Sequence, residues 1–146
     1  MAEPLSDAEQ KAWRTFIESS WQLHTRLEED LRATTGLSMN DYHVMVVLSE
    51  TPGRRLRMGE LAGRLVFSPS RITYQINSMV KRGLVRKQPC PEDGRGQEAV
   101  LTDEGMAALE AAAPLHLITV RDRFIDRLSW AELDVIATVF AKVREA

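Results

Sequence analysis

The chain has 146 residues, of which 44% are hydrophobic and 27% are charged, and its formal net charge is −2. This length and composition are typical of one globular domain with a hydrophobic core, and they exclude a disordered chain. No hydrophobic run reaches about 18 residues, which excludes a membrane-spanning helix. The opening sequence MAEPLSDAEQ lacks the apolar segment of a secretory signal, and the single cysteine cannot form an internal disulfide. We therefore expect a cytoplasmic protein.

The charges are distributed unevenly along the chain. Between Gly53 and Gln97 there are ten basic residues and three acidic ones, so this segment carries +7 although the whole chain carries −2. A basic segment within an acidic chain is typical of a surface that binds a polyanion such as nucleic acid. The same charges could instead pair with acids elsewhere in the fold. Charge alone does not distinguish these two interpretations.

The chain opens with a predicted long helix that starts at Ser6 and ends at Gly36. Ser6 and Glu9 have the spacing of a capping box, in which each side chain bonds the backbone N–H of the other residue. This helix is too apolar to stand alone, because it carries Trp13, Phe16, Ile17, Leu23, Leu27 and Leu31. We therefore expect it to pack on the core or on a second chain. A second helix opens at Ser38 and ends before the turn dipeptide Pro52-Gly53.

Two shorter helices follow a brief extended piece over residues 56–58. The first runs from Gly59 to Val66, and the second begins at Ser68, which suits a helix N-cap, with Pro69 at the first helical position and Gly83 as its stop. The spacing of Ile72, Ile76, Met79 and Val80 predicts one buried face. The opposite face is polar or basic and has no acid: Ser70, Arg71, Tyr74, Gln75, Ser78, Lys81 and Arg82.

Two short helices joined by a tight turn, the second with a polar and basic face, indicate a helix-turn-helix. Residues 84–88 then predict a strand and residues 98–101 its partner, with the turn-forming sequence CPEDGRGQ between them. A hairpin at this position is a wing. Its tip carries Arg95 between two glycines, where the side chain could reach into a narrow DNA groove. The sequence therefore predicts a mainly α fold with a small β-hairpin wing, a winged helix-turn-helix.

The remaining chain predicts two more helices. Thr102 caps the first, which contains Pro114 and should kink there, and Ser129 with Glu132 forms a capping box that opens the last. These helices and the first one are more apolar than one small winged domain can cover, so we expect dimerisation; packing within one chain is the alternative. In this interpretation residues 1–35 and 103–146 form the dimerisation helices, and residues 36–102 form the DNA-binding lobe of a single structural domain.

The wing and the helix that follows it carry a motif that resembles the MarR family of bacterial transcription regulators. The sequence DGRGQEAVLTDEG, with Asp93, Arg95, Leu101, Thr102 and Gly105, looks like the family signature D-x-R…L-T-x-x-G, and residues 58–62, 68–70, 73 and 83–85 match its helix-turn-helix. The resemblance spans roughly residues 12–143. It implies a homodimer whose terminal helices interlock, recognition helices in the major grooves, wing arginines in the minor grooves, and regulation by a small ligand, often an aromatic acid. One departure is Gln97, where a branched aliphatic residue is common.

These features predict a repressor that binds a palindromic site on double-stranded DNA as a dimer. Basic residues would neutralise phosphates, and the front of the recognition helix would read bases, with Arg71 suited to guanine and Gln75 to adenine. Thr73 suits a phosphate contact, although it could equally be half-buried. The expected DNA-binding residues are Ser68, Ser70, Arg71, Thr73, Tyr74, Gln75, Lys81, Arg86, Lys87 and Arg95.

A small-molecule effector would need a pocket near the first two helices and the helix that contains Pro114. The candidate lining residues are Trp13, Trp21, His24, Tyr42, His43 and His116, each of which could instead belong to the core. Cys90 lies at the base of the wing beside two prolines, where it could be exposed. It could act there as a redox sensor or be a bystander thiol.

Other classes of function receive less support from the sequence. The three histidines have no paired metal-ligand spacing, and the chain has no nucleophile elbow, P-loop or dinucleotide motif, so we expect no enzyme activity and no cofactor. A metal-responsive regulator remains an alternative, since ligands can assemble across helices. A winged helix that binds protein is a further alternative. Against it stands the polar and basic face from Arg71 to Arg86, because a protein-binding face usually exposes an apolar hot spot.

Overall fold

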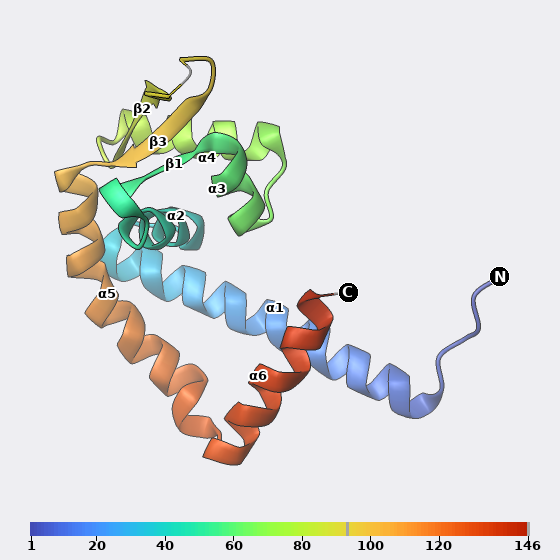
Figure 1. Ribbon diagram of the computed structural model, residues 1–146. Helices are drawn as coiled ribbons and strands as arrows, with labels where there is room; N and C mark the ends of the chain where they lie inside the picture. Colours follow the sequence, from blue (N-terminus) through green and yellow to red (C-terminus); the bar gives the residue numbers. More distant parts are fainter. Residues whose placement is uncertain (93, 146) are drawn as a thin grey trace. The chain divides into compact units, whose positions relative to one another are not determined.

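The structure is a computed structural model that describes residues 1–92 and 94–145 (Figure 1). Its elements follow in the order α1 (Asp7–Thr35), α2 (Met39–Ser49), η1 (Pro52–Arg54), β1 (Arg55–Arg57), α3 (Met58–Leu65), α4 (Pro69–Lys81), β2 (Val85–Pro89), β3 (Gln97–Leu101), α5 (Asp103–Arg123), η2 (Ile125–Arg127) and α6 (Trp130–Arg144). The chain forms two compact units, Met1–Asp30 with His116–Ala146 and Leu31–Leu115. The predicted mainly α winged helix-turn-helix is confirmed.

A three-stranded antiparallel sheet lies in the unit Leu31–Leu115. The strand order is β1-β3-β2, so β3 is central, and Leu56 of β1 pairs with Ala99 of β3. The sequence predicted the β2–β3 hairpin but placed the extended piece one residue late, at 56–58. In the structure Met58 already belongs to α3. The sequence did not show that this extended piece, β1, is a strand of the sheet, because three residues are too few to show alternation. Only its pairing with β3 defines β1 as a strand.

The core of this unit is formed by one face of each helix together with the sheet. Its largest fully buried side chains are Leu31, Val44, Met45, Leu48, Leu61, Ile76, Met79 and Val85. On α4 the predicted apolar face is confirmed for Ile72, Ile76 and Met79, but Val80 is 38% exposed. Val80 lies eight residues after Ile72, about 80° further round a helix of 3.6 residues per turn, so it falls at the edge of the buried stripe.

Capping boxes hold the starts of α1, α2 and α6; those of α1 and α6 were predicted, and the structure adds the one at α2. Ser38 accepts a bond from the N–H of Asp41 at 2.9 Å, and the Asp41 carboxylate accepts one from the N–H of Ser38 at 3.0 Å. Ser6 with Glu9 and Ser129 with Glu132 form the same pair of bonds. Glycine ends α1, where Gly36 has a φ of +76°. α5 continues as helix through Pro114 to Arg123.

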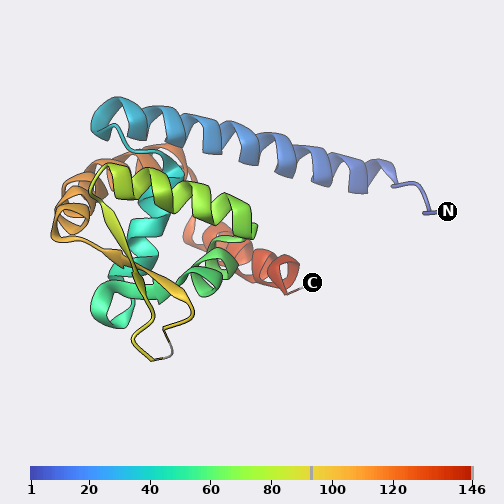
Figure 2. The ribbon, with the colours of Figure 1, turned by 90° about the horizontal axis from the view of Figure 1, so that it is seen from above.

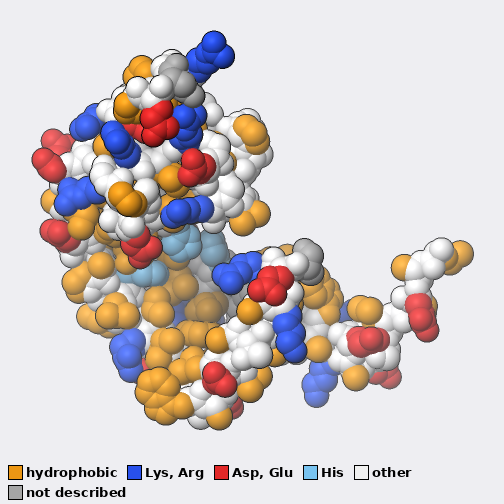
Figure 3. Space-filling model, in the orientation of Figure 1, with side chains coloured by type: hydrophobic (Ala, Val, Ile, Leu, Met, Phe, Trp, Pro, Cys, Tyr) orange, Lys and Arg blue, Asp and Glu red, His pale blue; other side chains and the backbone are white. Residues whose placement is uncertain are grey.

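The unit formed by residues 1–30 and 116–146 exposes much of its apolar surface. Within the single chain no residue of α6 is buried, and Figure 3 shows hydrophobic side chains gathered on the α5–α6 segment. The exposed large hydrophobic residues of this unit are Met1, Leu5, Trp13, Phe16, Trp21, Leu117, Ile118, Trp130, Val135, Val139, Phe140 and Val143. Its internal contacts include the rings of Phe16 and Phe140, 4.9 Å apart, and an ion pair between Asp30 and Arg123 at 2.6 Å. In the described residues no helix is both long and apolar enough to cross a membrane.

Candidate nucleic-acid interface

The turn between α3 and α4 positions the exposed helix face. Val66 adopts a left-handed conformation with a φ of +55°, and the N–H of Phe67 donates to the carbonyl oxygen of Ala62 at 2.8 Å. These are features of a Schellman motif, which ends one helix and redirects the chain. Ser68 then caps α4 by accepting a bond from the N–H of Arg71 at 3.2 Å, with Pro69 in the first turn. Local sequence therefore fixes where the front of α4 begins.

The front of α4 presents polar and basic side chains to solvent. Ser70, Arg71, Thr73 and Tyr74 are all exposed, and Tyr74 is the most accessible large side chain of the helix, at 79%. The Thr73 hydroxyl donates to the carbonyl oxygen of Pro69 at 2.9 Å, and the guanidinium of Arg71 lies 4.0 Å above the Phe67 ring. The first turn of α4 has no acid. This helix face can therefore meet an anionic surface without carboxylate repulsion.

Gln75 and Arg82 are held by a buried carboxylate on α2. The Gln75 amide nitrogen donates to Asp41 Oδ1 at 2.7 Å, and Arg82 donates from both terminal nitrogens to Asp41, each at 2.7 Å. Asp41 itself is 3% exposed. Gln75 is consequently half-buried and its amide nitrogen is occupied, so a role in reading adenine requires this hydrogen bond to break. Nothing in the sequence indicated this contact, because Asp41 was assigned only to the start of its helix.

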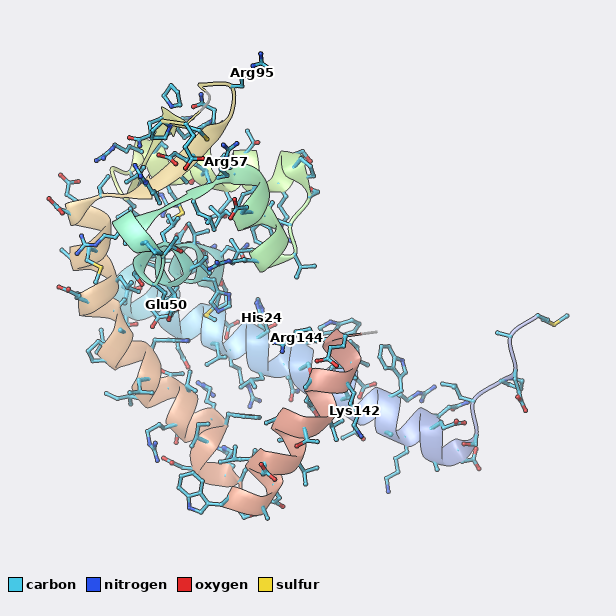
Figure 4. All side chains as sticks on the ribbon, in the orientation of Figure 1. His24, Glu50, Arg57, Arg95, Lys142 and Arg144 are labelled. Atoms are coloured by element: carbon cyan, nitrogen blue, oxygen red, sulfur yellow. The ribbon has the colours of Figure 1, made fainter. Side chains whose placement is uncertain are left out.

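The wing extends from the sheet as the β2–β3 hairpin, which projects beyond the helices of its unit (Figure 2). Arg86 and Lys87 on β2 are exposed, and Lys87 donates to the Asn77 side chain at 3.3 Å. Arg95 is exposed near the tip, with its side chain directed away from the lobe (Figure 4). Asp93, the first residue of the signature at the tip, lies outside the described residues. Gln97 is accommodated as an exposed residue paired with Pro89 at the start of β3.

A second buried acid lies at the base of the wing. Glu98 on β3 is 6% exposed and accepts a hydrogen bond from the Gln88 amide at 2.6 Å, and Arg55 lies 3.8 Å away. Arg57, labelled in Figure 4, pairs with Glu92 at 3.6 Å. These contacts connect β1 to the wing. Sequence alternation did not reveal Glu98, because β3 is central in the sheet and four of its five residues are buried.

The basic segment contains both paired and unpaired charges. Arg54, Arg55, Arg57 and Arg82 form ion pairs with Asp103, Glu98, Glu92 and Asp41, respectively. Within the described part of the chain, no salt bridge involves five of the other six cations, Arg64, Arg71, Lys81, Arg86 and Lys87. The unpaired cations therefore lie on α3, α4 and β2, while the paired ones bind the lobe together. The pairing interpretation is therefore confirmed for Arg54, Arg55, Arg57 and Arg82, and polyanion binding by the other cations stays a prediction.

Cys90 is not exposed, contrary to the expectation from its neighbouring prolines. The side chain is 2% exposed, and its backbone N–H donates to the Gly96 carbonyl oxygen at 2.9 Å. The wing turn folds back over it, since a Cβ on Gly96 would lie 3.1 Å from the sulfur. Residues 1–92 and 94–145 contain no group of three or more His, Cys, Asp or Glu side chains placed to hold a metal ion.

The six candidate ligand residues are placed in both units. Trp13, Trp21, His24 and His116 belong to one unit, and Tyr42 and His43 belong to the other. Trp13 and Trp21 are more than half exposed, His24 and His43 are exposed, and burial raises the pKa of the half-buried Tyr42. A cavity of about 400 Å³ in the first of these units contains none of the six. Its lining includes Phe16, Arg26, Arg123, Phe124, Arg127 and Phe140, a grouping that no sequence pattern indicated.

Comparison with known proteins identifies the family. Residues 35–96 match the model of the MarR family. The structure superimposes on AbsC, a MarR family transcriptional regulator from Streptomyces coelicolor, with a TM-score of 0.93 and 41% identity over 99% of this chain and 97% of AbsC. The chain belongs to the MarR family.

Two further relatives are also transcriptional regulators. Sco3205, a MarR family regulator from Streptomyces coelicolor whose structure contains DNA, is 37% identical over 99% of this chain and 91% of its own, with a TM-score of 0.95. The transcriptional regulator HosA of Escherichia coli O111:H- is 30% identical over 110 residues, which cover 75% of this chain and 79% of HosA. These relatives are regulators of transcription rather than enzymes.

Proposed function

We propose that this MarR family protein is a homodimeric, sequence-specific regulator that binds a palindromic site on double-stranded DNA and represses transcription there. The observation that carries the proposal is the acid-free, exposed front of α4 beside a wing with Arg86, Lys87 and Arg95. The DNA present in the structure of its relative Sco3205 supports the same activity. Repression follows from occupancy, because a protein bound across a promoter obstructs RNA polymerase.

The proposed contacts separate into three kinds. Ser68, Thr73, Lys81, Arg86 and Lys87 would contact phosphates, which gives affinity that falls as salt concentration rises. Ser70, Arg71, Tyr74 and Gln75 would read base edges in the major groove. Arg95 would enter the minor groove beside each half-site.

The terminal helices support dimerisation. An α6 with no buried residue and a row of exposed apolar side chains needs a partner surface, and a second copy supplies it symmetrically. We assign this role to residues 1–35 and 103–146, with residues 36–102 as the DNA-binding lobe. Sedimentation equilibrium at micromolar concentration should give twice the 16.5 kDa chain mass. A monomer at that concentration would exclude the dimer.

A small aromatic or phenolic effector would complete the proposed regulation. The cavity lined by Phe16, Phe124 and Phe140 with Arg26, Arg123 and Arg127 supports it, because phenyl rings suit an aromatic ring and guanidinium groups suit a carboxylate or phenolate. The set expected from the sequence, Trp13, Trp21, His24, Tyr42, His43 and His116, stays a prediction, because its members belong to both units. An effector acts only if it binds the DNA-bound and free conformations with different affinity. Thermal-shift screening of benzoate and phenol derivatives, followed by DNA release, tests this step.

Fluorescence anisotropy on duplex DNA tests the main proposal. A site selected from a random pool should be palindromic, with half-sites about one helical turn apart. Affinity should fall steeply between 50 and 200 mM salt, by roughly a thousandfold or more if six or more phosphates are contacted. Equal affinity for the selected site and for scrambled DNA at both salt concentrations would exclude sequence-specific binding.

A further inference from the structure

Phe67, in the turn before α4, is not part of the expected DNA-binding set, yet its ring contacts one member of that set. Its position is fixed by the left-handed Val66 and by the hydrogen bond from the Phe67 N–H to the Ala62 carbonyl oxygen. The ring is half-buried, and the guanidinium carbon of Arg71 lies 4.0 Å from its centroid. At this distance a guanidinium over an aromatic face gains a cation–π attraction.

Arg71 occupies a place that helix electrostatics disfavour for a cation. It is the third residue of α4, whose first turn contains no acid to offset its charge. The N-terminus of a helix carries partial positive charge, so a cation there is destabilising. Among the described residues no carboxylate pairs with Arg71. The negative face of the Phe67 ring provides the attraction to its positive charge instead. A cation at the positive end of a helix does not stabilise the helix. It does strengthen the attraction of this helix end for a phosphate or for the acceptor edge of a guanine.

With the guanidinium carbon 4.0 Å above the ring centroid, stacking of the flat face on the ring would leave the reading edge of Arg71 available. A guanidinium that lies on a ring uses its flat face, and its N–H donors point outward in the plane of the group. Those donors are the ones that bind guanine O6 and N7 as a pair. Stacking also restricts the rotamers of a long side chain before DNA arrives, so less conformational freedom is lost on binding.

We propose that Phe67 is a positioning residue for DNA recognition: it pre-orients the Arg71 guanidinium so that the arginine reads a guanine in the major groove. The inference rests on the proposed DNA-binding function and adds to it a specificity-determining contact made through a residue that does not itself touch DNA. Phe67 thereby links the turn of the helix-turn-helix to the choice of one base pair.

A double-mutant cycle on a duplex selected by the wild-type protein tests the proposal. Phe67→Leu keeps an apolar side chain and removes the ring, and we expect roughly tenfold weaker binding of the selected duplex. The loss should be confined to the duplex that contains the guanine read by Arg71. On a duplex with that G·C pair replaced by A·T, and in an Arg71→Ala background, Phe67→Leu should change affinity little. Phe67→Tyr should restore wild-type affinity and base preference.

Two results would overturn the inference. One is unchanged affinity and base preference in Phe67→Leu. The other is an equal loss on both duplexes and in the Arg71→Ala background, which would mean that the ring serves only the fold. NMR of the wild-type protein provides a measurement that needs no stable variant, because the Phe67 ring current should shift the Arg71 Cδ protons upfield. Absence of that shift would exclude the stacked arrangement. Failure of the wild-type protein to bind any duplex would count against the proposed function. The NMR measurement would still decide, independently of DNA binding, whether the Phe67 ring contacts Arg71.

Discussion

Arg82 at the end of α4 and Asp41 at the start of α2 form a two-pronged ion pair, with both N···O distances at 2.7 Å. The Asp41 side chain is 5% exposed, whereas that of Arg82 is 39% exposed. Asp41 also accepts hydrogen bonds from the Ser38 N–H and from Gln75. One buried carboxylate therefore caps its own helix and fixes the recognition helix against it.

Removal of the Asp41 charge should destabilise the lobe. In Asp41→Asn the amide oxygen can still accept hydrogen bonds, but Arg82 loses its counter-ion. A fully buried pair broken in this way costs about 3–5 kcal/mol, and because Arg82 is partly solvated we expect about 2 kcal/mol. Urea denaturation at pH 7 measures the change. Asp7→Asn, at an exposed acid in the first turn of α1, is the control and should change stability by less than about 0.5 kcal/mol.

The stability of the lobe should depend on pH through Asp41. Burial alone would raise the pKa of this carboxyl, but hydrogen bonds from Arg82, Ser38 and Gln75 and the charge of Arg82 outweigh burial and hold the pKa below its ordinary value. A carboxyl with a lowered pKa stabilises the fold above its unfolded-state pKa, about 4, and loses that contribution as the pH falls through its folded-state pKa. Denaturation curves between pH 7 and pH 2 should therefore show a smaller loss of stability in Asp41→Asn below about pH 4. Identical pH profiles would contradict this role.

Gly105 on α5 allows the helix to approach the strand end closely. A Cβ at this position would collide with the Leu84 carbonyl oxygen and lie 2.7 Å from Leu101 Cδ1. Since one of these atoms is backbone, Gly105→Ala should destabilise the protein by about 3 kcal/mol, at the upper end of the usual cost of overpacking. Thermal denaturation measures this effect.

Gly63 on α3 is the matched control for Gly105. Both glycines are helical, but a Cβ on Gly63 would meet nothing within 4 Å. Gly63→Ala should therefore stabilise the protein by roughly 0.5–1 kcal/mol, because alanine loses less conformational freedom in a helix. Equal effects of the two substitutions would show that helix propensity, rather than the close approach, controls Gly105.

Arg95 should contribute to DNA affinity. It is exposed near the wing tip and directed away from the lobe (Figure 4). Arg95→Ala should weaken binding of the selected duplex by about 1–3 kcal/mol without unfolding the dimer. Arg14→Ala, which removes an exposed arginine from α1, controls for the loss of one positive charge. An unchanged affinity for Arg95→Ala would remove the wing from the recognition mechanism.

The local elements followed from the sequence because short-range chemistry specifies them. Ser68 with Pro69 defined the start of α4, and the spacing of Ile72, Ile76 and Met79 defined its buried face. The predicted capping boxes of Ser6 with Glu9 and of Ser129 with Glu132 marked two helix starts correctly. The prediction was wrong for Val80 and Cys90, whose burial depends on neighbours contributed by other parts of the chain.

The sequence by itself determined the order and type of the elements, the polar face of α4 and the family motif, since each depends on residues a few positions apart. Only the tertiary structure decided which cations are available and which are paired. Asp41 lies 41 residues from Arg82, and Phe67 contacts Arg71 only because the Val66 turn presents its ring. The physical reason is that ion pairs and ring contacts depend on distances of a few ångströms, and the packing of α2, α4 and the sheet sets those distances.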